Sequence, residues 1–394
     1  MADTTVKRIH ESMRGAPVLN GVAGSLIALL DTFLVDGWGL ATANSLSVSG
    51  GVATLTMPAG SEFEDHCVVL VAGATPAALN GEQRIATTNG TTLTFPTTAA
   101  DGPATGTITV KYAPCGWQKV FSGANLAVYR SQNVMGNRRF LRVQDTGNVD
   151  ARVVAYNNMT AVSTGTGPFP TAAQISGGGY WPKSMSADSV AQRYDLVGDS
   201  MWLYYAPAPY YAYYAYYSGG SDYRVSSTRH FGDPIALRTA GDAWGTLLGV
   251  GTTSNPAGSN EGVSDFGQAG GCFVERAVSG TGGPVPIYLS PECWSSGAWS
   301  GEQPTMGAFP NAIDGKLRMT RQMARLSQSD YTPRSILPGL ELVPQSGLTS
   351  YASFQPRDTV PGPGSMSDRR LMYLWSGAGG KQGAFFIDIT GPWR

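Results

Sequence analysis

Alternating apolar and polar positions run through residues 38–113. "LSVSGGVATLTM" holds two short alternating segments around Gly50-Gly51, "CVVLVAG" is a continuous apolar run, and "GTITVKY" alternates again. "RIATTNGTTLTF" is typical of a hairpin, because Asn89-Gly90 tolerates the positive φ angles of a tight turn. Strands about every ten residues, with turn residues between them, predict a small immunoglobulin-like β-sandwich.

Before this region the apolar spacing is helical. Residues 1–18 are polar and predict an extended arm, and residues 20–35 repeat their apolar positions at intervals of three and four. The positions are Val22, Leu26, Ile27, Leu30, Phe33 and Leu34. We expect an amphipathic helix that ends at Gly37. Basic residues precede the run as in a signal peptide, but Asp31 interrupts it and it is too short to span a bilayer. We therefore predict neither an export signal nor a membrane segment.

After residue 113 the pattern predicts longer strands separated by Gly- and Pro-rich loops. The segments are "RRFLRVQD", "ARVVAY", "YDLVGDSMWLYY", "DAWGTLLGV", "GCFVER", "VPIYLS", "RLMYLWSG" and "GAFFIDIT". Only "GKLRMTRQMARLSQ", residues 315–328, indicates a second helix. The predicted fold is mainly β, in three parts. These are an arm and helix (1–37) packing on the main domain, an Ig-like β-sandwich insertion (38–113), and a larger β-rich domain with few helices (114–394).

Composition changes this picture in one respect. Charged residues make up 14% of the chain, against about 25% in an average protein, and the net charge is −1. Burial against partner subunits would suit so few charges, although an unusually neutral monomer is the alternative. Because Lys and Arg are scattered, no nucleic-acid partner is expected. Four widely spaced cysteines without a CxxC pair indicate free buried thiols in a reducing cytoplasm.

Two short motifs invite a chemical interpretation. "LVGDS" resembles the nucleophile motif of SGNH-type esterases, but Ser200 lies in mid-chain and His230, the only later histidine, has no Asp three residues before it. A turn between two strands explains the motif equally well. "EFEDHC", residues 62–67, offers metal-ligand side chains, yet three histidines in the whole chain make a complete site hard to build. We interpret it as a solvated loop, and predict no catalytic residue, no metal site and no cofactor.

Several phrases, in order, resemble a family of virion structural proteins of tailed bacteriophages. "GAPVLNGVAGSLIALLDTFLVDGWG" resembles the opening arm and helix of the family. "GWQKVFSGANLAVYRS", "RRFLRVQDTG", "ARVVAYNNMTAVSTGTGPFPT" and "YWPKS" resemble its central block, and "FFIDITGPWR" its ending. The resemblance covers residues 16–37 and about 115–394. The resemblance implies that in simpler relatives the helix runs almost directly into the "GW-x-K" segment, and that residues 38–113 are an insertion.

This resemblance implies a structural role in the virion, most directly in the tail or baseplate, through contacts with other copies of the chain and with neighbouring virion proteins. It implies synthesis in the cytoplasm of the bacterial host. The alternatives are a receptor-binding tail module that grips host cell-surface glycan and a decoration protein on the capsid surface. Copy number, symmetry and position in the virion stay open.

The stretch "MWLYYAPAPYYAYYAYY", residues 201–217, supplies a candidate contact surface. As a strand, its end places tyrosines on both faces, and as a helix it leaves only a narrow aromatic-free stripe. Nearby carboxylates and amides, which a sugar site needs, are scarce. Tyrosine is enriched at protein interfaces. We therefore predict a subunit contact, with a loop folded onto its own domain as the alternative, made by Tyr210, Tyr211, Tyr213, Tyr214, Tyr216 and Tyr217.

Overall fold

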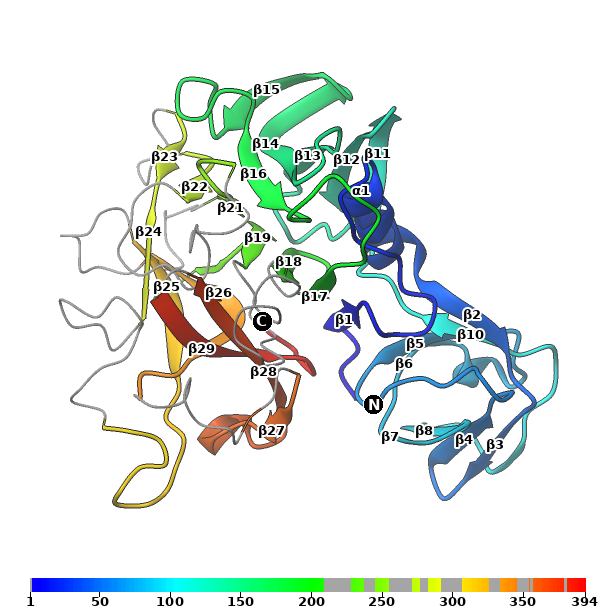
Figure 1. The fold of residues 1–394 in the computed structure, drawn as a ribbon. Helices are drawn as coiled ribbons and strands as arrows, with labels where there is room; N and C mark the ends of the chain where they lie inside the picture. Colours follow the sequence, from blue (N-terminus) through cyan, green and yellow to red (C-terminus); the bar gives the residue numbers. More distant parts are fainter. Residues whose placement is uncertain are drawn as a thin grey trace.

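The computed structural model describes residues 2–208, 228–236, 245–254, 271–276, 283–291, 307–325, 334–345, 354, 357–378 and 381–394. The chain is 48% strand and 6% helical, which confirms the predicted mainly β fold. Within the described ranges the strands form five antiparallel sheets, and Figure 1 shows β17 (Arg193–Gly198) and β18 (Trp202–Ala208) near the middle of the molecule with the other sheets around them.

Residues 38–113 build two facing sheets whose strands pair only with one another. The first sheet has the order β2 (Trp38–Thr42), β10 (Thr109–Tyr112), β5 (Val68–Ala72), β6 (Gly81–Arg84). The second has the order β7 (Thr87–Asn89), β8 (Thr92–Pro96), β4 (Val52–Thr56), β3 (Ser45–Ser49), β9 (Gly102–Pro103). A short 3-10 turn, η2, spans Ala77–Leu79. Both predicted hairpins, β3–β4 and β7–β8, are confirmed, with positive φ at Gly50, Gly51 and Gly90.

The predicted N-terminal helix is present but begins later than expected. Helix α1 spans Ser25–Leu30 and continues as the π-helical turn η1, Asp31–Asp36. The expected start at residue 20 is wrong, because Gly24 has a φ of 88°, which the preceding turn requires and an α-helix does not allow. The end at Gly37 is confirmed, with a φ of 72°. The helix buries one apolar face, made of Leu26, Leu29, Leu30, Phe33 and Leu34.

The arm is extended and is also part of a sheet. Strand β1 (Lys7–His10) pairs antiparallel with β17 (Arg193–Gly198) and forms the edge of a seven-stranded sheet. The other strands of this sheet are, in order, β18 (Trp202–Ala208), β19 (Arg229–Gly232), β21 (Leu247–Gly249), β22 (Cys272–Val274) and β23 (Val285–Pro286).

A six-stranded sheet covers the helix. Its strands are β11 (Trp117–Gly123), β12 (Leu126–Ser131), β13 (Phe140–Gln144), β14 (Asp150–Ala161) and β15 (Thr164–Phe169), with β16 (Gly179–Pro182) paired to β14. The backbone of the helix joins this layer where the amide of Cys115 donates to the carbonyl of Phe33 at 3.0 Å.

The last sheet is C-terminal and corrects one prediction. Its strands are β24 (Tyr288–Pro291), β25 (Thr320–Arg325), β26 (Ser335–Leu342), β29 (Lys381–Asp388), β28 (Arg370–Ala378) and β27 (Thr359–Pro361), with β20 (Ile235–Ala236) paired to β26 and the 3-10 turn η5 at Gly364–Met366. The helix predicted over residues 315–328 is wrong, because Thr320–Arg325 is a strand between β24 and β26. All of it except Arg321 is buried, so sheet pairing outweighs the helical spacing.

One apolar core links the sandwich to the main body. Trp38 at the base of the sandwich stacks on Tyr112 with ring centroids 4.8 Å apart, and Phe33 of the helix lies 6.3 Å from Trp38. The core continues from these rings into the six-stranded sheet. A second core fills the space between the seven-stranded and C-terminal sheets. Among the described residues, no helix is both long and apolar enough to cross a membrane.

Candidate functional site

Charged side chains gather where β1 meets the sandwich and the C-terminal sheet. We call this group, Arg8, His10, Glu11, Glu64, Asp195 and Arg357, the ionic junction. Arg357 donates from Nε to Asp195 at 2.8 Å and from Nη1 to Glu11 at 3.1 Å. Its φ is +76°, an uncommon conformation for a residue other than glycine. The contacts of this one guanidinium therefore join the C-terminal region, the arm and β17.

Glu64 brings the sandwich into the ionic junction. One carboxylate oxygen lies 3.0 Å from Nε2 of His10 and 3.2 Å from Nη2 of Arg8. The backbone amide of Glu64 donates to the Tyr112 hydroxyl at 3.2 Å, which holds the loop against the base of the sandwich. Ser12 Oγ lies 2.9 Å from the other ring nitrogen of His10. The imidazole is thus fixed from both sides.

Two acids of the ionic junction, Glu64 and Glu11, are held in their charged forms. Burial alone would raise the pKa of Glu64, but the hydrogen bond with His10 and the nearby charges outweigh it, and the pKa is lowered. Burial alone would also raise the pKa of Glu11, but the hydrogen bond from Arg357 outweighs this effect, and the pKa is lowered. An acid whose pKa is lower in the folded than in the unfolded chain stabilises the fold in its ionised form.

Arg84 of β6 fastens the sandwich through backbone carbonyls. Its guanidinium donates to the carbonyl of Val6 in the arm at 2.9 Å and to that of Ile389 near the C-terminal end at 2.9 Å. It also reaches the carbonyls of Asp3 and His66. Burial lowers the pKa of Arg84, and the four carbonyls compensate for its desolvation.

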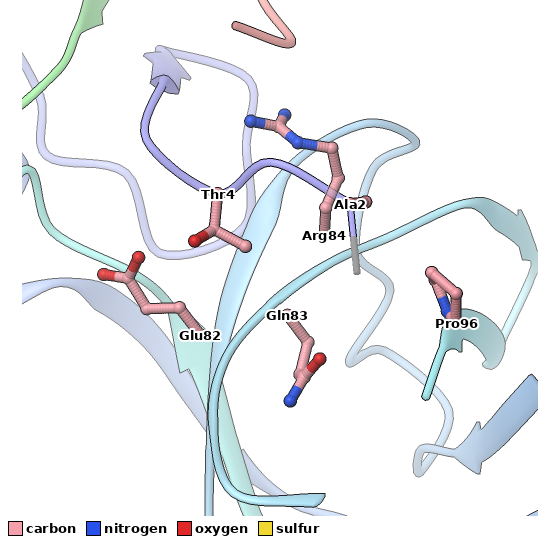
Figure 2. A pocket seen from close by; sticks show the side chains of 6 residues that line it. All are labelled: Ala2, Thr4, Glu82, Gln83, Arg84 and Pro96. Atoms are coloured by element: carbon pink, nitrogen blue, oxygen red, sulfur yellow. The ribbon is translucent and has the colours of Figure 1, made fainter. Parts of the chain in front are cut away.

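A small cavity of about 210 Å³ lies beside Arg84, lined by Ala2, Thr4, Glu82, Gln83, Arg84 and Pro96. Figure 2 shows the Arg84 side chain extending away from Pro96. Glu82 pairs with Lys7 at 2.9 Å. Both charged side chains of the lining are therefore already engaged in holding the arm to the sandwich.

A second ionic site, which we call the helix clamp, fixes α1. Lys183 and Asp145 are fully buried, with Nζ and Oδ1 2.5 Å apart. The other oxygen of Asp145 accepts the backbone amides of Leu26 at 2.8 Å and Ile27 at 3.2 Å, and Lys183 donates to the carbonyl of Val22 at 2.7 Å. The carboxylate thus caps the first turn of the helix from 119 positions away in the chain.

The esterase-like motif forms a turn between β17 and β18. Ser200 Oγ accepts a hydrogen bond from Asn133 Nδ2 at 2.8 Å, and Asp199 Oδ1 accepts the amides of Met201 and Trp202. His230 lies elsewhere on β19, stacked on Trp202 with its Nε2 3.2 Å from Cys272 Sγ. Burial lowers the pKa of His230 to about 3. The structure does not bring Ser200 and His230 together.

The loop 62–67 is more firmly packed than a solvated loop. Glu64 belongs to the ionic junction and Cys67 is buried. Among the described residues, no three metal-ligand side chains gather to hold an ion. Cys67, Cys115 and Cys272 are free and buried, as predicted, and Cys293 lies outside the described residues.

The predicted contact tyrosines, residues 210–217, lie outside the described residues. Only the start of that stretch is described. There Tyr204 and Tyr205 are buried and donate to the carbonyls of Pro338 and Pro182. Sequence reasoning missed both ionic sites. The residues of each site are far apart in the chain, and no sequence spacing distinguishes them from other charged residues.

Comparison with known proteins identifies no family for this chain. No protein-family profile matches the chain, and no significant match is found among curated protein sequences.

Proposed function

We propose that this chain is a structural subunit of a tailed-phage virion, in the tail or baseplate, which acts through contacts with other copies and neighbouring virion proteins. One observation carries the proposal. The helix clamp joins three of the phrases that resemble this family. The helix supplies the first, Asp145 lies in "RRFLRVQDTG" and Lys183 lies in "YWPKS".

This observation supports the proposal because residues of those phrases fix the helix to the rest of the body. The phrase at the end of the chain is also bonded to other elements. Arg369 donates to Asp388 at 2.7 Å, and Arg394 donates to Asp199 at 2.9 Å. Residues that hold a body together are what a subunit needs when its task is to keep a shape under the forces of assembly.

The ionic junction supports the same function. Its guanidinium and carboxylate groups bind one another across the arm, the sandwich and the C-terminal region, so their charges are used inside the molecule. A chain with 14% charged residues has few more to place on its surface. Weakly charged surfaces lose little solvation when subunits cover them.

The experiment is light scattering and electron microscopy of the purified full chain between 1 and 100 µM, concentrations chosen on the order of typical subunit affinities. The proposal expects a discrete ring or smaller closed oligomer. A monomer throughout this range contradicts it. A monomer that also binds lipopolysaccharide on a glycan array would favour the receptor-binding alternative.

A further inference from the structure

The buried ion pair of the helix clamp brings an amine and a carboxyl group together without water. The side chains of Lys183 and Asp145 have no exposed area, and Nζ lies 2.5 Å from Oδ1. Within the described ranges neither group has a second ion-pair partner. Burying two charges costs solvation energy that their mutual attraction only partly returns. A neutral bond between the same two groups would remove that cost.

The second oxygen of Asp145 is held as the oxygen of an acyl group under attack is held. Oδ2 accepts the backbone amide of Leu26 at 2.8 Å and that of Ile27 at 3.2 Å. Two N–H donors on one oxygen polarise the carboxyl carbon and stabilise the negative charge that develops when a nucleophile adds to it. The two amides therefore favour attack on Cγ of Asp145.

Lys183 is placed as the nucleophile. Its Nζ also donates to the carbonyl of Val22 at 2.7 Å, so the amine is fixed from two sides. Cγ of Asp145 is one C–O bond beyond Oδ1, which sets Nζ near the roughly 3–3.5 Å at which reacting atoms stand before a bond forms. In an amide, the remaining N–H keeps the Val22 carbonyl and the C=O keeps both backbone amides. The surroundings thus satisfy the product completely.

A third carboxyl group lies beside the backbone of Lys183. Asp150 of β14 is opposite Pro182 in the sheet, and the amide of Lys183 donates to the carbonyl of Val149 at 2.8 Å. Oδ2 of Asp150 accepts from Ser254, whereas its buried Oδ1 has no hydrogen-bond partner among the residues described. Burial raises the pKa of Asp150, and the charge of Lys183 is among those that oppose this shift, so the two groups are within electrostatic range. Asp150 is therefore suited to exchange a proton with the pair.

We propose that Lys183 and Asp145 condense after folding to a side-chain amide, a covalent cross-link between the segment after β13 and the segment after β16. The lone pair of Nζ forms the bond to Cγ, and the bond from Cγ to Oδ1 breaks. Oδ1 leaves as water with two of the three ammonium protons. No atom is oxidised or reduced and no co-reactant is consumed. The cross-link goes beyond the proposed structural function and does not depend on it.

A second Lys–Asp pair shows what burial adds. Lys119 Nζ lies 2.6 Å from Asp31 Oδ2, almost as close as in the clamp, but the two side chains are 33% and 19% exposed. Water reaches this pair and solvates its charges. Water is also the product that condensation must expel, so this pair stays ionic. Distance alone therefore does not select the reacting pair.

The test is intact mass spectrometry of the purified, folded full chain under denaturing conditions. The chain should be lighter than its sequence by one water molecule, whereas wild-type chain kept in denaturant since synthesis should have the full mass. Trypsin does not cleave after an acylated lysine. The digest should therefore contain residues 143–152 joined to residues 153–193, with Lys183 uncut, while cleavage after Lys119 in the same digest is normal.

Two variants locate the chemistry. Lys183→Met should keep its full mass. Asp150→Asn, which retains the shape of the side chain, should slow the loss of water at least about tenfold after refolding, an effect on rate that a purely structural role would not produce. A folded wild type with the full mass and normal cleavage after Lys183 would overturn the cross-link, as would a water loss located in another peptide. Condensation of Asp150→Asn at the wild-type rate would overturn the role of Asp150 alone.

Discussion

The helix clamp and the ionic junction each tie an N-terminal element to the body, and they differ in burial. In the clamp, Lys183 and Asp145 have no exposed side-chain area. In the junction, the side chain of Glu64 is 35% exposed and that of Arg357 is 22% exposed. A charge that loses its partner inside the protein stays unpaired, whereas a half-exposed charge is solvated by water. Loss of one partner should therefore be strongly destabilising in the clamp, whereas loss of one partner in the junction should lower stability by a smaller amount.

The largest effect is expected from breaking the clamp. Lys183→Met should lower the free energy of unfolding by about 3–5 kcal/mol, because Asp145 is left as a buried carboxylate. Denaturant unfolding measures this value. Lys119→Met is the control, since Lys119 pairs with Asp31 of the same helical segment at a site that is one third exposed. It should cost less than about 1 kcal/mol. Equal losses in the two variants would contradict the difference in burial.

The next effect concerns His230, a buried titratable group held by stacking instead of an ion pair. Its folded pKa of about 3 lies below the unfolded value, so only the unfolded chain takes up its proton as pH falls from about 6.5. This residue should remove about 1.4 kcal/mol of stability for each pH unit below about 6. His230→Phe keeps the stack on Trp202 and should flatten that slope in thermal unfolding from pH 7 to pH 4. Parallel slopes for the two proteins would argue against a neutral buried ring.

A smaller loss is expected when the junction loses Arg357. Arg357→Ala should cost about 2 kcal/mol, because Glu11 keeps partial access to water while the buried Asp195 loses its partner. Arg357→Gly should cost about 1 kcal/mol less than the alanine variant, since glycine accepts the φ of +76° without strain. Urea unfolding of the two variants measures both numbers. A glycine variant less stable than the alanine variant would show that this backbone is unstrained.

The smallest effect is expected at Glu64. Its pKa is lowered, so its contribution to stability is present above the ordinary value near 4.3 and is lost as pH falls through the folded value. Glu64→Gln should cost about 1 kcal/mol at pH 7 and nothing once the wild-type carboxylate is protonated. Glu62→Gln, two residues away and exposed, is the control and should leave thermal unfolding unchanged at both pH values. A constant difference across the acid range would exclude the titration of Glu64 as the cause.

The strands were predictable because their signal is local. In residues 38–113 the strands β3, β4 and β8 alternate within five residues, and Gly50-Gly51 and Asn89-Gly90 mark the turns directly. The helix boundary was not predictable, because the group that caps the first turn is Asp145, 119 positions away in the chain. Residues 320–325 were mistaken for a helix because their burial depends on pairing with β24 and β26, which lie outside the segment.

The ionic sites could not be predicted from the sequence in the same way. Glu11 and Arg357 are 346 positions apart, and nothing in either segment marks the other as a partner. Arg8, His10 and Glu11 look like the polar residues of a solvated arm until the pairing of β1 with β17 places them against the sandwich. Charge pairing is decided by the fold, so it follows the topology and does not precede it.

The central claim, that the charges of the junction hold the arm to the body, is tested most directly by hydrogen exchange of single amides. The wild type and Arg357→Ala are compared at pH 7. The variant should lose protection in β1, at Ile9 above all, while Leu26 and Ile27 at the clamp keep theirs. Unchanged protection of β1 in the variant would contradict the claim, because it would show that Arg357 does not hold the arm to the body.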